Sequence, residues 1–208
     1  MHEAAWPLFI LASLVVIATP GQDMILVMSR SLAQGPRAGV ATAAGVSLGL
    51  LGHTLIATLG LGAILRASEW LFFGLKLAGA AYLVYLGISL LRTKAADLAL
   101  MGAGQRSMSK LFMEGAISNL SNAKIVVFYL AFLPQFVSPT AEHPTLTVFA
   151  LGATFAALTF LVKGPVGIFA GALSGWLRRR PAALTWIYRS SGAILIALGL
   201  RLAFERRA

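Results

Sequence analysis

Cysteine is absent from the 208-residue sequence, so disulfides, thiolate metal sites and dithiol redox chemistry are excluded. Charge is also scarce: 12% of the residues are charged, against roughly 25% in soluble domains. The three histidines, His2, His53 and His143, lack the spacing of metal ligands, and the sequence has neither a phosphate-binding loop nor a nucleophile with a nearby base. These absences predict a protein that is not an enzyme and that holds no metal or cofactor.

Apolar residues make up 58% of the chain, and the mean hydropathy is +0.83. They gather in six segments, each near or above the roughly 20 residues that a helix needs to cross the hydrocarbon core of a bilayer. The sequence therefore predicts an all-α integral membrane protein with six transmembrane helices, at residues 6–28, 38–65, 70–91, 111–137, 146–173 and 184–204.

The basic residues are distributed unequally between the connections. The first, third and fifth connections contain Arg30, Arg37, Arg92, Lys94, Arg106, Lys110, Arg178, Arg179 and Arg180, whereas the second connection and the C-terminal tail contain Arg66, Arg206 and Arg207. Because Lys and Arg are enriched in cytoplasmic loops, this asymmetry predicts that both termini lie outside the cytoplasm. The same sidedness explains the net charge of +10 without a nucleic-acid partner.

The longest connection, residues 93–110, divides the six segments into two groups of three. We expect two three-helix repeats of inverted orientation, at residues 1–92 and 111–208, joined by a cytoplasmic linker at 93–110. In support, the stretch that begins at Asp23 aligns with the stretch that begins at Lys124, which superposes two polar interruptions. Chance similarity between apolar helices of restricted composition is the alternative.

Asp23 falls inside the first apolar segment, where a charge at mid-membrane costs about 2.5–3.5 kcal/mol. It follows Pro20, Gly21 and Gln22. Because proline removes a helical N–H and glycine adds backbone freedom, we expect the helix to be interrupted there. Freed backbone groups need protein or water as partners, so the interruption is expected to face inward. Alternatively, Pro20-Gly21 ends the span and Asp23 caps an interfacial helix.

Lys124 interrupts the fourth segment in a similar way. It follows Asn119 and Asn122, whose amides are suited to a hydrated cavity or to the end of a half-helix. Alternatively, this polar stretch is a cytoplasmic amphipathic start, and the span begins only at Ile125. In the first interpretation, helices 1 and 4 of the bundle are both interrupted.

Opposite charges at equivalent positions of two repeats lead to a specific hypothesis. Asp23 and Lys124 are expected to face a common cavity near a pseudo-two-fold axis. Since a buried ion pair is weak evidence for stability, its presence points to a pathway or a switch. The site suits a zwitterion, because Asp23 can accept from an ammonium group while Lys124, Asn119 and Asn122 can meet a carboxylate. Asp23 can also take up a proton, which offers a route to proton coupling.

Three further features are open to two interpretations. Lys163, followed by Gly164 and Pro165, marks a second charge beside a helix break; it lines the same cavity or has a structural or interfacial place. His53 is expected to hydrogen-bond between helices rather than to carry protons. Glycines at four-residue spacing predict close packing of the second and fifth segments, inside the bundle or between the subunits of a homo-oligomer: Gly35, Gly39, Gly45, Gly49, Gly167, Gly171 and Gly175.

Two motifs give the chain a resemblance to a known family. The first is Thr19-Pro20-Gly21-Gln22-Asp23-Met24, continued by Ser29-Arg30-Ser31-Leu32-Ala33-Gln34-Gly35-Pro36-Arg37. The second is Gly115-Ala116-Ile117-Ser118-Asn119-Leu120-Ser121-Asn122-Ala123-Lys124, continued by Phe128-Tyr129-Leu130-Ala131-Phe132-Leu133-Pro134. In order and spacing the chain resembles the lysine exporter and homoserine/threonine exporter (LysE/RhtB) family. Two family prolines are replaced here, by Gln22 and Ala123.

The resemblance implies a multi-pass protein of the bacterial inner membrane that exports amino acids or close derivatives with the proton gradient. Its partners would be the amino acid, protons and the lipid bilayer. We therefore expect a secondary transporter that works by alternating access. A metal or inorganic-ion exporter and a non-transporting membrane scaffold subunit are the alternatives.

Overall fold

The computed structural model describes residues 5–67, 69–92, 105–137 and 141–204. Over these residues the chain folds almost entirely into helices, as the apolar segments predict. The elements are α1 (Trp6–Ala18), α2 (Gln22–Gln34), α3 (Pro36–Ala67), α4 (Glu69–Arg92), α5 (Met108–Leu120), α6 (Ala123–Phe132), the 3-10 turn η1 (Leu133–Phe136), α7 (Pro144–Ile168), α8 (Ala170–Arg179) and α9 (Pro181–Phe204). A helix satisfies its backbone hydrogen bonds internally, which lipid requires of any spanning segment.

Two of the helices have the length and composition of a membrane span by themselves. Residues Pro36–Gly60 of α3 and all of α7, Pro144–Ile168, each form an apolar stretch of 25 residues. At 1.5 Å per residue such a stretch is about 37 Å long, more than the ~30 Å hydrocarbon core. In the described part of the chain, α1 and α2 together make a third such span, bent by 53°. The structure thus has the helices of a multi-pass membrane protein.

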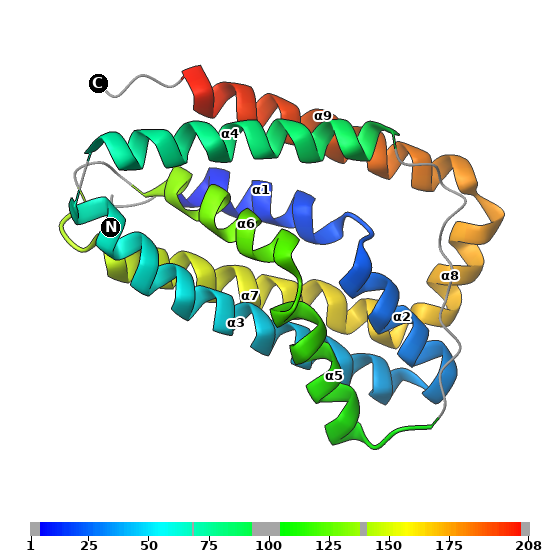
Figure 1. The fold of residues 1–208 in the computed structure, drawn as a ribbon. Helices are drawn as coiled ribbons and strands as arrows, with labels where there is room; N and C mark the ends of the chain where they lie inside the picture. The colour runs from blue at the N-terminus through cyan, green and yellow to red at the C-terminus, as the bar shows by residue number, and fades with distance from the viewer. Residues whose placement is uncertain (1–4, 68, 93–104, 138–140, 205–208) are drawn as a thin grey trace.

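The helices pack in three layers, shown in Figure 1. Helix α4 lies along α9, and α3 lies along both α7 and α5. Helices α1 and α6 lie between these two layers, where α1 contacts α7 and α9 and α6 contacts α4 and α3. Helix α1 begins at the same end of the bundle at which α9 ends (Figure 1).

The first and fourth apolar segments are both interrupted, as the sequence predicts. Helix α1 ends at Ala18 and α2 begins at Gln22, with Pro20 and Gly21 in the break. The freed groups find local partners, since the Thr19 hydroxyl donates to the carbonyl of Val15 at 2.8 Å. In the fourth segment, α5 ends at Leu120 and α6 begins at Ala123. Each break thus places polar side chains in the interior at the end of a short helix.

The fifth segment differs from the prediction. A break at Gly164-Pro165 was expected, but α7 continues through Pro165 to Ile168. Its last turn is held by α2 and α3, because the Ser31 hydroxyl donates to the carbonyl of Gly167 and Gly167 packs directly on Gly39. Packing therefore compensates for the hydrogen bond that the proline removes. The chain then turns at Phe169 into α8, a separate helix within the end of the predicted segment 146–173.

Close helix packing at glycine is present at some of the predicted positions. A Cβ added to Gly39 of α3 would lie 2.8 Å from the Cα of Gly167 in α7, and one added to Gly49 would lie 2.8 Å from the carbonyl of Ala116 in α5. Gly171, by contrast, has no neighbour within 4 Å of such a Cβ. Gly35 has another role, since its φ of 90° makes the turn between α2 and α3. Gly39 and Gly49 of α3 and Gly167 of α7 therefore pack these helices inside the bundle.

Candidate functional site

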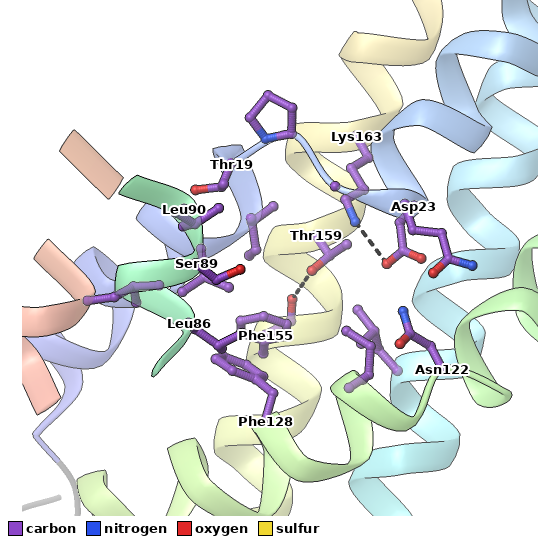
Figure 2. A pocket seen from close by; sticks show the side chains of 18 of the residues that line it. Thr19, Asp23, Leu86, Ser89, Leu90, Asn122, Phe128, Phe155, Thr159 and Lys163 are labelled. Atoms are coloured by element: carbon purple, nitrogen blue, oxygen red, sulfur yellow. Dashed lines mark hydrogen bonds and ion pairs between the residues drawn. The ribbon is translucent and has the colours of Figure 1, made fainter. Parts of the chain in front are cut away.

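Asp23 lies in the first turn of α2, directly after the break, and only 7% of its surface is exposed. One oxygen, Oδ2, accepts a hydrogen bond from Nδ2 of Asn119 at 3.0 Å and an ion-pair contact from Nζ of Lys163 at 3.1 Å. Figure 2 shows the ion pair from α7 to α2. The Asp23 side chain therefore lies at the positive end of the α2 helix dipole. Three helices, α2, α5 and α7, thus meet at one buried carboxylate.

His53 holds the main chain of Asn119 in place through a hydrogen bond. Asn119 is fully buried at the end of α5, and Nε2 of His53 in α3 lies 3.1 Å from its main-chain carbonyl. A carbonyl oxygen only accepts, so Nε2 of His53 carries the proton of this hydrogen bond. The His53 ring also lies next to the ring of Tyr129, with centroids 5.9 Å apart. His53 accordingly forms a link between helices, as the sequence suggests.

The second oxygen of Asp23 has a different environment. Oδ1 is buried and has no hydrogen-bond partner among the described residues. A carboxylate oxygen can accept two hydrogen bonds, and a buried acceptor without a donor costs about 1–3 kcal/mol. The carboxylate therefore retains capacity for a further donor.

Beside this ion pair is a cavity of about 340 Å³. Pockets for small organic ligands begin at about 300 Å³. Its lining comes from all six predicted apolar segments and includes the loop between α1 and α2. The lining residues are Val16, Ile17, Thr19, Pro20, Gly21, Gln22, Asp23, Leu50, Tyr82, Leu86, Ser89, Leu90, Asn122, Ile125, Phe128, Phe155, Thr159, Lys163, Tyr188 and Leu195.

The cavity has a charged side and an uncharged side (Figure 2). Asp23, Lys163 and Asn122 lie on one side, whereas Leu86, Leu90 and Phe128 lie on the other. Asp23 and Lys163, which neutralise each other, are the charged residues among those described as lining it. The cavity therefore offers one charged pair and a large uncharged surface.

Aromatic rings close one end of the cavity. Phe128 and Phe155 line it with centroids 5.5 Å apart, and behind them Phe132 lies 4.6 Å from Phe128 and 4.8 Å from Phe136. Phe9 of α1 packs on Phe136 at 5.2 Å. All five side chains are at least 96% buried. This aromatic cluster, Phe9, Phe128, Phe132, Phe136 and Phe155, joins the first turns of α1 to α6, η1 and α7.

The structure brings most of the predicted site residues together. Pro20, Gly21, Gln22, Asp23, Asn122 and Lys163 line the cavity, and Asn119 binds Asp23 from the adjoining helix. Gly164 is buried next to Lys163, while Pro165 is exposed. Lys124 is the second residue of α6, but its side chain lies outside the described residues, so its meeting with Asp23 stays a prediction. The observed cationic partner of Asp23 is Lys163.

Several cavity residues were missed in the sequence. Phe155 and Thr159 precede Lys163 at intervals of four, which places the three on one face of α7. That spacing was a usable signal. Tyr82 and Ser89 of α4 and Tyr188 of α9 lie in apolar segments that give no sign of which face turns inward.

A second polar cluster lies at the end of the bundle where α2 meets α5. Arg30 of α2, with 8% of its side chain exposed, pairs with one oxygen of Glu114, and Nη1 of Arg106 lies 3.2 Å from the other oxygen. The Gln34 amide and the Arg106 backbone form two reciprocal hydrogen bonds of 2.8 and 3.0 Å. This cluster fastens the segment before α5 to α2.

The fold and the cavity define a multi-pass helical membrane protein with an internal site large enough for a small molecule. Within the described residues, no group of three or more His, Cys, Asp or Glu side chains is placed to hold a metal ion. The family profile described as LysE type translocator matches residues 14–206. The chain belongs to this family of translocators.

Relatives named as efflux proteins share most of the chain. It is 33% identical over 205 residues to the homoserine/homoserine lactone efflux protein of Salmonella typhimurium, covering 98% of both chains. It is 27% identical over 158 residues to the leucine efflux protein of the same species, covering 73% of this chain and 72% of that one. An uncharacterized membrane protein of Pseudomonas aeruginosa is 32% identical over 201 residues, covering 94% and 93%. No solved structure matches the chain significantly.

Proposed function

We propose that this protein is a secondary transporter that exports amino acids across the bacterial inner membrane, and that the cavity beside Asp23 is its substrate site. The observation that carries the proposal is the buried ion pair of Asp23 and Lys163 at a cavity lined from all six apolar segments. Charges inside a membrane bundle are costly and mark substrate and ion pathways. The named activities of the homoserine and leucine efflux relatives agree with this function.

The ion pair matches the charges of an α-amino acid. The ammonium group of the substrate binds the free Oδ1 of Asp23, and its carboxylate binds Lys163, with Asn122 as a further donor. Binding then exchanges one internal ion pair for two pairs with the substrate, so no charge is left unpaired while the substrate is bound. Asn119 holds Asp23 in place, and Pro20, Gly21 and Gln22 form the adjoining wall. Lys124 is a second cation proposed for the carboxylate.

The remaining wall favours an uncharged substrate side chain. Leu86, Phe128 and Phe155 lie in the part of the cavity away from the ion pair (Figure 2). A second ammonium or carboxylate placed among these residues would be desolvated without a partner, a cost of several kcal/mol. We therefore infer that neutral amino acids are exported and that lysine, arginine, aspartate and glutamate are excluded.

Alternating access is supported by the pairing of helices. Three helix pairs have extensive contacts, and two of them, α3 with α7 and α4 with α9, join helices that would correspond in two inverted three-helix repeats; the third joins α3 to α5. The cavity is lined by residues near the end of α4 and the start of α9, the predicted cytoplasmic side, whereas Phe9 and Phe136 of the aromatic cluster lie near the start of α1 and in η1, toward the opposite side. Export then requires the helices carrying this cluster to separate. With this orientation both termini lie outside the cytoplasm, and protonation of Asp23 when the substrate leaves couples export to the proton gradient.

An efflux screen tests the proposal. Cells that lack and cells that carry the protein are loaded with single amino acids as dipeptides, and the external amino acids are measured over time. Neutral amino acids should appear faster with the protein, and Asp23→Asn or Lys163→Gln should abolish the difference at equal membrane levels. Glu142→Gln, which neutralises an exposed acid, is the matched control and should export normally. Export by both site variants would reject the site; metal-dependent growth rescue without amino-acid export would favour an inorganic-ion exporter.

A further inference from the structure

A second hollow in the protein lies on the outer surface of α5, away from the cavity. It is a groove of about 470 Å³, lined by Arg106, Lys110, Met113, Glu114, Ile117 and Ser118. The proposed transport function uses none of these residues. The groove opens at the start of α5, in the connection that is predicted to be cytoplasmic.

The charge of this groove is positive. Glu114 pairs with both Arg30 and Arg106, so this group of three cations, with Lys110, and one anion keeps a net positive charge. Arg106 and Lys110 are exposed, and the Lys110 ammonium has no ion-pair partner among the described residues. Arginine and lysine at neighbouring positions are suited to the oxygens of a phosphate group.

An exposed apolar face continues from the cations along α5. Met113 is 49% exposed, Ile117 is 56% exposed and Leu120 is 42% exposed. Lys110 lies three residues before Met113 and so shares this face. From Lys110 to Leu120 the helix rises about 15 Å, which is half of the ~30 Å hydrocarbon core. The face therefore has a charged end and an apolar length that fit one leaflet.

We propose that the groove on α5 binds an anionic phospholipid, with its phosphate held by Arg106 and Lys110 and one acyl chain along Met113 and Ile117. Anionic lipids are drawn to basic residues at the cytoplasmic face of membrane helices. The site is preorganised, because Gln34 of α2 holds the backbone of Arg106 through two hydrogen bonds. Lipid bound here fastens the connection before α5 to the helix that carries Asp23.

The test measures lipid binding to the purified full-length protein in mild detergent, by native mass spectrometry. Phosphatidylglycerol and phosphatidylcholine with identical acyl chains are the probes. We expect phosphatidylglycerol to bind more tightly, and Lys110→Gln to weaken it about fivefold, the effect of one basic residue near a phosphate. Arg37→Gln removes an exposed cation at the start of α3 and is the matched control, with no expected change.

Three outcomes would overturn the proposal. Equal binding of the two lipids would show that the phosphate charge is not recognised. Equal weakening by Lys110→Gln and Arg37→Gln would show only diffuse attraction to a basic surface. Displacement of the lipid by inorganic phosphate would show a site for a free anion instead. Because the readout is lipid binding, a failure of the transport proposal leaves this test unaffected.

Discussion

The buried ion pair makes a prediction that separates stability from transport. Lys163→Gln alone leaves the Asp23 carboxylate buried with Asn119 as its described partner. Asp23→Asn alone leaves the Lys163 ammonium without its observed counter-charge. The double variant Asp23→Asn/Lys163→Gln contains two neutral amides of similar size, which can hydrogen-bond to each other. Each single variant should therefore be less stable than the double variant.

The magnitude follows from the geometry. At the observed 3.1 Å, and with an effective dielectric constant of about 20, the attraction of the two charges is about 5 kcal/mol. The side chains are only 10% and 8% exposed, so most of this attraction replaces lost hydration. Removal of one partner from such a pair costs about 3–5 kcal/mol, whereas neutral replacement of both is often without net cost. We expect each single variant to lose about 3 kcal/mol and the double variant to lose less than about 1 kcal/mol.

The assay combines chemical unfolding of purified protein with transport in proteoliposomes. The double variant should regain stability and export nothing, because neither amide can neutralise the charges of a zwitterion. Full transport by the double variant would refute the role of the charges in binding. Equal and additive losses of stability would show instead that the two side chains do not interact.

Substitutions at three other positions have predictable effects on stability or export. Gly39→Ala should lower the free energy of unfolding by about 1–3 kcal/mol, because the added methyl group overpacks the contact with α7. Gly60→Ala should be tolerated, because its methyl group would meet nothing within 4 Å. Chemical unfolding measures both variants, and equal effects would contradict the close packing at Gly39. His53→Ala should slow export in proteoliposomes, because it removes the hydrogen bond to the Asn119 carbonyl. His53→Gln keeps an N–H donor but cannot shuttle a proton, so it should restore part of the export rate. A stable but inactive His53→Gln variant would point to proton transfer by His53 instead. Phe155→Ala should enlarge the cavity and shift competition profiles toward bulkier neutral amino acids. An unchanged profile would show that the Phe155 side chain does not contact the substrate.

The positions of the helix breaks were predictable because their causes are local. Pro20 removes a helical N–H and Gly21 adds backbone freedom, and the polar run around Asn119 and Asn122 interrupts an apolar segment. The continuation of α7 through Pro165 was not predictable, because it depends on the packing of Gly167 against another helix.

The partner of Asp23 illustrates the same limit. The expected repeat gave Lys124 as a partner of Asp23, and the sequence left open whether Lys163 lines the same cavity. In the fold, α7 runs beside α2, and Lys163 reaches the carboxylate from there. A pairing between residues 140 positions apart depends on the assembled bundle, not on either segment alone. Types of residue were predictable from the sequence, and their neighbours were not.

The absence of cysteine allows the cavity to be probed directly in the otherwise native chain. Ser89→Cys places one thiol in the cavity lining, and Ser107→Cys places one at the exposed start of α5 as a control. Labelling by a water-soluble maleimide is measured with and without a transported neutral amino acid. The amino acid should slow labelling of Ser89→Cys and leave the labelling rate of Ser107→Cys unchanged. Labelling of Ser89→Cys at the same rate with saturating substrate would contradict the claim that this cavity holds the substrate.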